Sequence, residues 1–515
     1  MNRRLALVAC GAAMAVAACS GGESIIDSGN EATTTASTPA VTTMPTGDTS
    51  STGDTLSPGD TTIAPTTAAP TTSTTPLDAL PPCPVEALDA ADGPVEVLFW
   101  HGLTGETDRA IQDLTAAYNA SQSRVRIKLE PQGSYDETFD KYIQSSQDSR
   151  PDLVIFPEYY VQQTIDSDSV IPIGACIRNA GFDMTEFQPA AIVTYSTAGV
   201  QWAMPFNVSN PVLYYNRSMF LAAGLDPDRP PLSLDDLREY SQALVDSGAA
   251  AYGIAVDSAF NAFGGWVFEQ WFANAGELYA DNGNGHLAPA TRVLYDGPLG
   301  VELLTFVQEL VQDGLAYDVG GNAGGQDHFL KLADREESAA MTVGSSASLG
   351  TIKVAVDGGL IPGITGDDIG VGPLPGPSGS PTALVGGAAL YIVADHGDEV
   401  AAAAWDYITY LVSAQSQSEW ASRTGYVPVR EDALALDPLA TKYAEDPRFK
   451  VAYDQLAASP DDPAFQGPIL GPQREVRVAT ARAVAVILEG GDVPAALSDA
   501  AAQANALIAD YNARN

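Results

Sequence analysis

The sequence predicts an α/β fold in which largely parallel sheets are covered by helices. Strand-like and helix-like segments alternate from residue 95 onward, and a second series of the same kind begins at residue 211. Such alternation is typical of parallel sheets with crossover helices. More than four hundred residues follow residue 93, which is more than one hydrophobic core usually serves. The sequence therefore predicts two lobes.

The first series has the order β-α-β-α-β. Its predicted elements are a strand at 95–100, a helix at 106–121, a strand at 125–129, a helix from Ser134 to about Gln147 and a strand at 152–156. Ile111, Leu114 and Tyr118 recur at helical spacing in the first helix. Ser134 and Glu137 have the spacing of a capping box, which predicts where the second helix begins.

The second series is longer and ends in helices. Its predicted elements are a strand at 211–215, a helix capped by Ser233, a strand at 252–256, helices at 298–312 and 328–335, strands at 339–343 and 384–393, and a mainly helical end from Glu399. Ligands of open α/β sheets bind beyond the carboxyl ends of strands. The first candidates for a site are therefore His101, Glu158 and the turn at 344–346.

The first nineteen residues have the features of an export signal. Arg3 and Arg4 form a basic start, and the apolar run 5–18 is shorter than the roughly 20 residues that span a bilayer. Small residues directly before Cys19 resemble a bacterial lipobox, so we predict a lipoprotein signal peptide at 1–18 and acylation of Cys19. The alternative is an ordinary signal peptide cut nearby. Either way, the rest of the chain is expected to be exported.

A disordered tether is predicted over residues 19–92. Most residues between 28 and 82 are Thr, Ser, Pro, Ala, Gly or Asp. Ordering such a segment would cost conformational entropy that no hydrophobic core offsets. We expect the tether to hold the folded region at the outer face of the cytoplasmic membrane. It either carries O-linked sugar or is a plain flexible linker.

Two cysteines remain for a disulfide in the mature protein. Cys10 leaves with the signal peptide and Cys19 takes the lipid, so Cys83 and Cys176 are left. An oxidising exported compartment favours a bridge between them, and closing a loop of this length stabilises a protein by about 4–5 kcal/mol in the chain-entropy model. Two unpaired thiols are the alternative. The bridge would attach the end of the tether to the first lobe.

Composition and motifs argue against several function classes. A formal net charge of −40 makes nucleic acid and anionic lipid surfaces poor partners. We predict no metal and no cofactor, because the four histidines lie far apart and the sequence has no Cys-x-x-Cys, Walker loop or Gly-x-Gly-x-x-Gly pattern. No Gly-x-Ser-x-Gly motif is present either. The hypothesis of a secreted hydrolase acting on a glycoside or glycerophosphodiester therefore has no specific support.

Residues 344–349, Gly-Ser-Ser-Ala-Ser-Leu, form a candidate anion site. They follow a predicted strand and begin an amphipathic stretch, which places backbone N–H groups and hydroxyls at the start of a helix. The alternative is simple N-capping by serine.

Several motifs occur together in one order. They are Phe99-Trp100-His101, Gly133-Ser134-Tyr135, Pro205-Phe206-Asn207 with Tyr214-Tyr215-Asn216, Ala223-Gly224-Leu225-Asp226-Pro227 with Pro230-Pro231, Gly344-Ser345-Ser346, Gly386-Gly387-Ala388 and Thr424-Gly425-Tyr426-Val427-Pro428. This set closely resembles the extracellular solute-binding proteins of ATP-driven importers, specifically the branch that binds sn-glycerol 3-phosphate. The resemblance covers about residues 93 to 515.

The resemblance implies a two-lobed periplasmic-binding-protein-like clamp whose chain crosses the hinge three times. By analogy, the crossings are expected near 207–211, 344–346 and 411–415. The lobes implied are lobe 1 at 93–208 and 346–412, and lobe 2 at 209–345 and 413–515. Such a clamp is expected to be a monomer that delivers its solute to the membrane subunits of an ABC permease, without chemistry of its own.

The resemblance also implies a set of ligand contacts. They are Tyr135, Glu158, Ser209, Ser345, Gly387, Tyr426 and Arg477, with Arg474 as a near alternative to Arg477. A phosphate would be held by Arg477, Tyr426, Ser345 and Gly387. Glu158 only accepts hydrogen bonds, so we expect it at the opposite end, holding glycerol hydroxyls or a cationic group. Trp100 and Trp266 either line the cleft or pack in the core.

One position departs from the family pattern and bears on the choice of ligand. After Pro230-Pro231 the family usually has an aromatic residue where this chain has Leu234. If this side chain faces the ligand, it leaves room for a larger head group. The expected ligand is therefore sn-glycerol 3-phosphate or a diester such as glycerophosphocholine. The alternative is a sugar or oligosaccharide receptor of the same fold, which stacks sugar rings on aromatic side chains and does not need Arg477.

Overall fold

The computed structural model describes residue 80 and residues 82–321 and 326–515. The predicted signal peptide, the predicted lipidation site Cys19 and most of the predicted tether lie outside these residues. No helix within the described ranges is long and apolar enough to cross a membrane. Residues 82–92, predicted as tether, instead belong to the folded region: η2 (Ala87–Ala90) contacts α13 (Asp398–Leu411), and Leu88 is buried.

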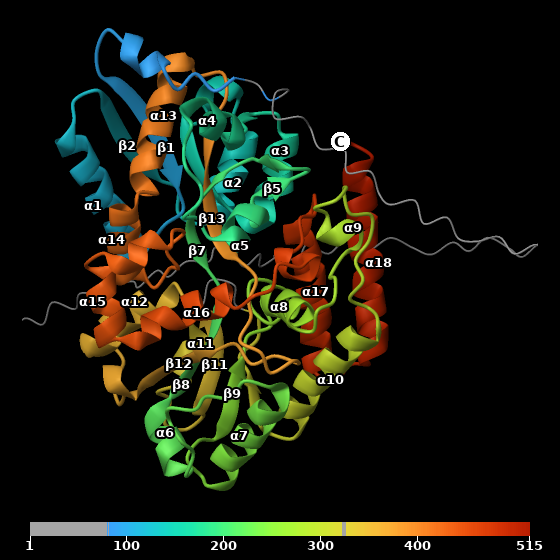
Figure 1. Ribbon diagram of the computed structural model, residues 1–515. Helices are drawn as coiled ribbons and strands as arrows, with labels where there is room; N and C mark the ends of the chain where they lie inside the picture. The colour runs from blue at the N-terminus through green and yellow to red at the C-terminus, as the bar shows by residue number, and fades with distance from the viewer. Residues whose placement is uncertain (1–79, 81, 322–325) are drawn as a thin grey trace, which may run out of the picture. The chain divides into compact units, whose positions relative to one another are not determined.

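The first sheet has the strand order β2-β1-β3-β13-β4, with β7 paired to β13 (Figure 1). Its strands are β1 (Val95–His101), β2 (Val125–Pro131), β3 (Leu153–Pro157), β4 (Val170–Ile171), β7 (Met204–Ser209) and β13 (Gly386–Val393). The strands β1, β2 and β3 are parallel, whereas β13 runs antiparallel to its neighbours β3, β4 and β7. The helices of this lobe include α1 (Gly105–Ser121), α2 (Tyr135–Gln144), α3 (Val161–Asp166), α4 (Ile173–Ala180), α5 (Pro189–Thr194) and α13.

The second sheet has the order β10-β9-β11-β8-β12. Its strands are β8 (Pro211–Asn216), β9 (Tyr252–Val256), β10 (Ala316–Asp318), β11 (Ala339–Ser345) and β12 (Ile369–Pro373). The strands β10, β9 and β11 are parallel, and β8 is antiparallel to both β11 and β12. The remaining helices are α6 (Arg217–Ala222), α7 (Leu234–Asp246), α8 (Trp266–Asn274), α9 (Asp281–Asn284), α10 (Pro298–Gln312), α11 (Asp327–Leu330), α12 (Ser348–Asp357), α14 (Ala414–Thr424), α15 (Leu439–Glu445), α16 (Val451–Ala457), α17 (Gln473–Leu488) and α18 (Val493–Asn512). The prediction of two lobes built from mixed and parallel sheets is confirmed.

Local signals placed most helix starts correctly. In α2 the Ser134 hydroxyl accepts from Glu137 N at 3.1 Å, and Ser134 N donates to the Glu137 carboxylate at 2.7 Å, which is the predicted capping box. Ser233 caps α7 by accepting from Asp236 N at 3.0 Å. The helix predicted at 328–335 is shorter than expected, because α11 ends at Leu330.

The strand β12 corrects the expected course of the chain. Residues 346–412 were expected in lobe 1, yet β12 pairs with β8 in the second sheet, so the chain returns to the first sheet only at β13. At the first change of sheet, Asn210 alone separates β7 of the first sheet from β8 of the second. The strand signal of β12 is weak because it contains Gly370 and Gly372. A Cβ on either would collide with Tyr215 or Pro230, so close packing requires glycine at both positions.

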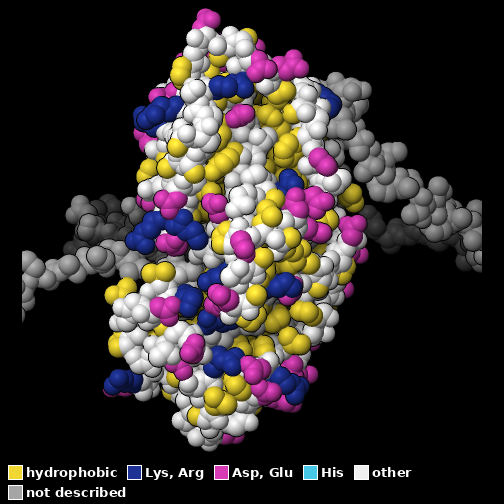
Figure 2. Space-filling model, turned by 60° about the vertical axis from the view of Figure 1, so that its left-hand side comes forward, with side chains coloured by type: hydrophobic (Ala, Val, Ile, Leu, Met, Phe, Trp, Pro, Cys, Tyr) yellow, Lys and Arg dark blue, Asp and Glu magenta, His cyan; other side chains and the backbone are white. Residues whose placement is uncertain are grey.

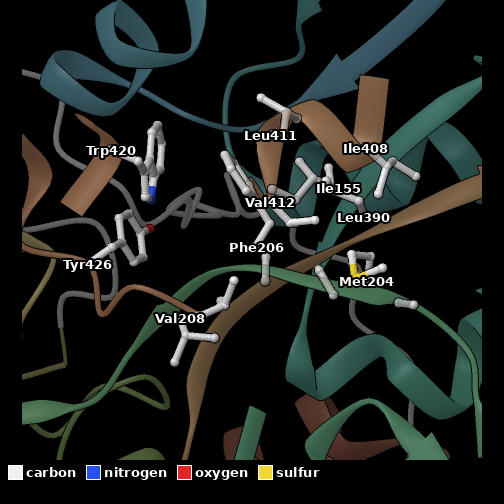
Figure 3. Close-up of a cluster of buried hydrophobic side chains, with 14 of the residues drawn as sticks. Ile155, Met204, Phe206, Val208, Leu390, Ile408, Leu411, Val412, Trp420 and Tyr426 are labelled. Atoms are coloured by element: carbon white, nitrogen blue, oxygen red, sulfur yellow. The ribbon is translucent and has the colours of Figure 1, made fainter. Parts of the chain in front are cut away.

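Figure 3 shows the hydrophobic cluster that fixes the segment after α14. The rings of Phe206 on β7 and Trp420 on α14 have centroids 4.9 Å apart, and Trp420 stacks on Tyr426 at 5.5 Å and 20°. Val427 N donates to Val208 O at 2.7 Å, which ties this segment to β7. The cluster therefore holds Tyr426 against the first sheet.

The surface carries both signs of charge despite the strong net acidity. On the face in Figure 2, Lys and Arg side chains lie among Asp and Glu side chains rather than in a separate patch. Arg423, for example, contacts Glu106 and Asp113, both at 2.8 Å. Partly exposed pairs of this kind contribute little stability each. The excess acidic charge is thus partly compensated by local pairing.

A disulfide joins Cys83 and Cys176, the pair expected from the sequence. It attaches the segment before η2 to α4 in the first lobe, and both cysteine side chains are buried. We predict that replacing both cysteines by alanine lowers the free energy of unfolding by about 2–5 kcal/mol, because the loop is then open in the unfolded chain. Urea unfolding followed by circular dichroism would measure this, and an unchanged midpoint would contradict it.

A second prediction concerns His101 at the end of β1, whose side chain is fully buried. Burial lowers the pKa of His101 from its ordinary 6.5 to about 4, although Asp108 opposes this shift. As the pH falls, His101 is therefore protonated in the unfolded chain before it is protonated in the folded protein. This difference lowers the free energy of unfolding by about 3 kcal/mol between pH 6.5 and pH 4.

The measurement is the free energy of unfolding at pH 7 and at pH 4.5 for the wild type and for His101→Gln. The wild type should lose more stability than the variant over this interval. The buried His286 and His328, whose pKa values are also lowered, are present in both proteins and cancel. An equal loss of unfolding free energy in both proteins between pH 7 and pH 4.5 would show that His101 does not contribute to the pH dependence of stability.

Candidate ligand-binding site

Residues of both lobes line one cavity of ≈ 170 Å³. The first lobe contributes the turn after β1, the start of α2 and the turn after β3, where Glu158 and Tyr159 begin η4 (Glu158–Tyr160). The second lobe contributes the end of β11, the start of α12, Phe260 and Trp266, and α17 adds Arg477. The cavity thus lies at the carboxyl ends of strands, where open α/β sheets bind their ligands.

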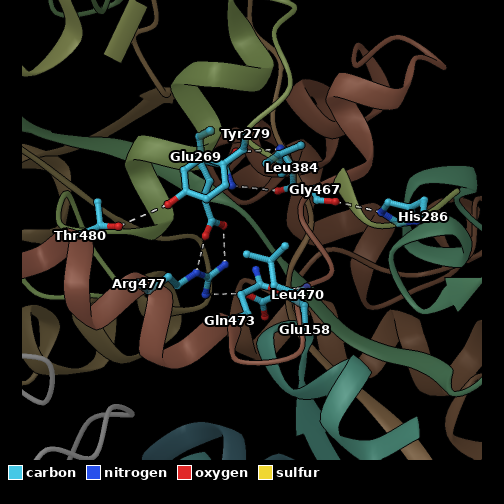
Figure 4. Close-up of polar contacts among 11 residues, drawn as sticks. Glu158, Glu269, Tyr279, His286, Leu384, Gly467, Leu470, Gln473, Arg477 and Thr480 are labelled. Carbon is cyan, nitrogen blue, oxygen red and sulfur yellow. Dashed lines mark hydrogen bonds and ion pairs between the residues drawn. The ribbon is translucent and has the colours of Figure 1, made fainter. Parts of the chain in front are cut away.

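Arg477 is the centre of the polar contacts at this cavity (Figure 4). Its Nε and Nη2 donate to the two carboxylate oxygens of Glu269 at 2.8 and 2.7 Å. Its Nη1 donates to Glu158 Oε1 at 3.0 Å. Only 2 % of the Arg477 side chain is exposed, yet the residue still lines the cavity. Bidentate pairs of this kind fix the plane of a guanidinium.

Burial and charge act in opposite directions on this cluster. Burial disfavours the Arg477 cation, but the attraction of Glu269 and Glu158 exceeds this effect and raises the pKa of Arg477 further above its ordinary value. Burial raises the pKa of Glu158, and the attraction of Arg477 offsets only part of that rise. The guanidinium is therefore charged at every physiological pH.

A second arginine pair lies beside the first. Arg474 Nε donates to Asp136 Oδ2 at 2.9 Å, and Asp136 Oδ1 accepts from the hydroxyls of Tyr160 at 2.8 Å and Tyr159 at 3.2 Å. The Arg474 guanidinium lies over the Phe260 ring at 5.3 Å. Asp136 lines the cavity, whereas Arg474 does not. Of the two arginines proposed from the sequence, Arg477 is thus the one placed at the cavity.

Two tyrosine hydroxyls meet at the first-lobe side. Tyr135 at the start of α2 receives a hydrogen bond from Asn207 Nδ2 at 2.6 Å, and its hydroxyl lies 3.4 Å from that of Tyr426. Gly387 lies next to them with φ of +93°, and a Cβ there would stand 2.0 Å from Asn207 O. Only glycine fits at this position, because both the conformation and the space exclude a side chain.

The turn between β11 and α12 also faces the cavity. Ser345, Ala347 and Ser348 line it, and Ser345 Oγ accepts from Ala347 N at 3.2 Å. The hydroxyl of Ser345 therefore accepts its hydrogen bond from the N-cap residue of α12 rather than from the helix itself. That N-cap residue, Ala347, has no side chain that could cap the helix. An anion at this turn stays a prediction.

The structure brings most of the predicted contacts together. The predicted residues that line the cavity are Tyr135, Glu158, Ser209, Ser345, Gly387, Tyr426 and Arg477. Leu234 is not among the lining residues. It is the first residue of α7 and packs, half-buried, against the core of the second lobe. The extra space expected from Leu234 therefore does not open into this cavity.

The expected separation of Glu158 and Arg477 is wrong. We expected them at opposite ends of the site, but they form an ion pair at 3.0 Å. The two residues are 319 positions apart in the chain, so no local pattern could indicate this contact. The pair joins η4 of the first lobe to α17.

Sequence reasoning missed Glu269 and left the tryptophans open. Glu269 is an acidic residue in the otherwise apolar helix α8, and a charge inside such a helix must find a partner, which is a usable signal. Trp266 lines the cavity. Trp100 does not line it: its indole donates to Glu130 at 2.6 Å, and Lys141 lies 3.9 Å from its ring centroid.

The chain belongs to the bacterial extracellular solute-binding proteins, whose family model matches residues 113–451. It is a solute-binding protein of an ABC importer and is similar to the sn-glycerol-3-phosphate-binding periplasmic protein UgpB. The UgpB of Shigella flexneri is 27% identical over 421 residues, which are 80% of this chain and 92% of that protein. The UgpB of Escherichia coli K12 is 26% identical over the same shares.

Solved structures show the same fold. UgpB from Mycobacterium tuberculosis in complex with glycerophosphocholine is 23% identical, with a TM-score of 0.66 over 82% of this chain and 100% of that chain. The cyclic alpha-maltosyl-1,6-maltose binding protein from Arthrobacter globiformis is also 23% identical, with a TM-score of 0.66 over 81% of this chain and 100% of that chain. The predicted clamp fold is thereby confirmed.

Gly102 tests how the cavity wall is built. A Cβ on Gly102 would lie 2.4 Å from the carbonyl carbon of Ser134, so alanine must displace the start of α2. We predict that Gly102→Ala lowers the free energy of unfolding by about 1–3 kcal/mol, because the backbone at Ser134 cannot move away from the new methyl group without a cost in energy. Gly93→Ala is the matched control, because a Cβ on Gly93 would meet no atom within 4 Å. Equal midpoints for both variants in urea would refute the prediction.

Proposed function

We propose that this chain captures a glycerophosphodiester with a cationic head group, such as glycerophosphocholine, and delivers it unaltered to an ABC permease. Free sn-glycerol 3-phosphate is the weaker ligand in this proposal. We also propose that the protein is anchored through lipid on Cys19 and acts as a monomer. The observation that carries the choice of ligand is the charge balance around Arg477.

When all three carboxyl groups are ionised, the charges near the cavity leave an excess of negative charge. Asp136, Glu158 and Glu269 face the two guanidinium groups of Arg474 and Arg477. A phosphate monoester close to a double negative charge would meet this excess unfavourably. A diester carries one negative charge, and a choline head group adds a positive one. A zwitterion of this kind suits the cavity better than a dianion.

Arg477 can still bind a phosphate oxygen. A guanidinium has five N–H donors, and the bonds to Glu158 and Glu269 use one each on Nε, Nη1 and Nη2. One N–H therefore remains on Nη1 and one on Nη2. With the hydroxyls of Tyr426 and Ser345 nearby in the cavity wall, these donors supply a monoanion with several hydrogen bonds.

Aromatic side chains supply the second half of the proposed site. Tyr159, Phe260 and Trp266 line the cavity together with Glu158 and Asp136. The faces of such rings attract quaternary ammonium groups, and a nearby carboxylate adds to that attraction. Phe260 and Tyr159 each already have a guanidinium 5.3 Å from the ring centroid. Trp266 is thus our choice for contact with a cationic head group.

The second candidate is a sugar or oligosaccharide. Aromatic rings and carboxylates also suit a sugar, whose rings stack and whose hydroxyls donate, and Arg477 already has carboxylate partners. The Arthrobacter globiformis protein, which is described as binding cyclic alpha-maltosyl-1,6-maltose, has this same fold. A sugar receptor would not require free N–H groups on Arg477.

Calorimetry on the purified protein tests the proposal with three ligands: glycerophosphocholine, sn-glycerol 3-phosphate and maltose. We expect glycerophosphocholine to bind at least ~10-fold more tightly than the monoester, and maltose not to bind.

The variant Arg477→Lys tests the role of the guanidinium. Lysine keeps the positive charge but lacks the planar fork of donors, so the affinity for the diester should fall by about 10–100-fold, which is the effect of losing one hydrogen bond to a charged group.

Arg474→Lys is the matched control, because Arg474 does not line the cavity, and its effect should be several-fold smaller. Binding of maltose alone would favour the sugar receptor. Mass spectrometry of the recovered solute addresses the hydrolase hypothesis. A receptor releases the diester intact, whereas a hydrolase adds water and releases either glycerol phosphate and choline or glycerol and phosphocholine.

A further inference from the structure

Glu269 has a position that the binding of a ligand does not by itself explain. It lies in the middle of the apolar helix α8, is 1 % exposed and does not line the cavity. A carboxylate in such surroundings loses its hydration, which is costly unless it is paired and hydrogen-bonded. Its partner is Arg477, through two bonds of 2.8 and 2.7 Å.

The pair holds Arg477 from within the second lobe. The helices α8 and α17 both contact α10, and Phe268, Trp271 and Val476 share one hydrophobic core. Glu269 therefore occupies one edge of the guanidinium, with or without a ligand. A guanidinium fixed in this way loses less conformational freedom when a ligand binds.

Glu269 also cancels one positive charge directly behind the cavity wall. Without Glu269, the two positive charges of Arg474 and Arg477 would equal the two negative charges of Asp136 and Glu158. With it, the five side chains carry a net charge of −1 if all are ionised, two positive charges against three negative ones. Because Glu269 does not line the cavity, it changes the charge there without taking space from the ligand.

We infer that Glu269 determines specificity at this site: it orients the Arg477 fork and, by its charge, selects diesters against dianionic phosphate monoesters. This inference rests on the proposed function and adds to it the residue that discriminates between the two phosphate classes. Glu269 acts through Arg477 and is a positioning residue rather than a ligand contact.

The test compares glycerophosphocholine and sn-glycerol 3-phosphate by calorimetry on three proteins: the wild type, Glu269→Gln and Glu269→Asp. Glu269→Gln removes the charge and keeps the shape, so the affinity ratio should shift by at least ~10-fold toward the monoester. Glu269→Asp keeps the charge but is too short to hold both nitrogens, so both ligands should weaken in parallel with the ratio preserved.

Glu277→Gln is the charge control, since Glu277 is exposed beyond the end of α8 and should leave both affinities unchanged. If Glu269→Gln weakens both ligands equally, the inference is overturned while the proposed function stands. If the wild type binds neither phosphate, both are overturned. A preserved ratio in Glu269→Gln with a shifted ratio in Glu269→Asp would likewise overturn the charge argument.

Discussion

The buried contact of Arg477 with Glu269 and Glu158 is the interaction on which the site depends. It joins α17 to α8 within one lobe and to the turn after β3 in the other. Each of these side chains is at most 9 % exposed, so each charge would destabilise the protein if its partner were removed. The cluster therefore sets where the guanidinium lies, how many of its donors remain and how negative the cavity wall is.

The hydroxyl side of the cavity depends on packing instead of charge. Tyr426 is held by stacking on Trp420 and by the bond between Val427 and β7. Tyr135 is held at the start of α2, whose close approach to β1 requires Gly102. Close-packed neighbours leave these rings little freedom, so the two hydroxyls are positioned before a ligand arrives. The site thus combines a charged half and a packed half.

Local patterns predicted those elements whose signals lie within a few residues. The capping box of α2, the Ser233 cap of α7 and the apolar face of α1 are of this kind, because hydrogen bonds and periodicity there involve near neighbours. The strand β12 was not predicted, since its glycines carry little strand propensity and its place is set by pairing with β8. Motif resemblance brought Tyr135, Tyr426 and Arg477 to one site, whereas Leu234, singled out because it departs from the family pattern, packs elsewhere.

The sequence by itself determined the α/β class, the two-lobed organisation, the cysteine pair and seven of the residues that line the cavity. Only the tertiary structure decided that Glu158 pairs with Arg477, that Glu269 lies behind the arginine and that β12 belongs to the second sheet. The physical reason is that ion pairs and strand pairing depend on distances between segments remote in the chain. Residues 208 and 319 positions apart meet in the same cluster, and no local spacing records that.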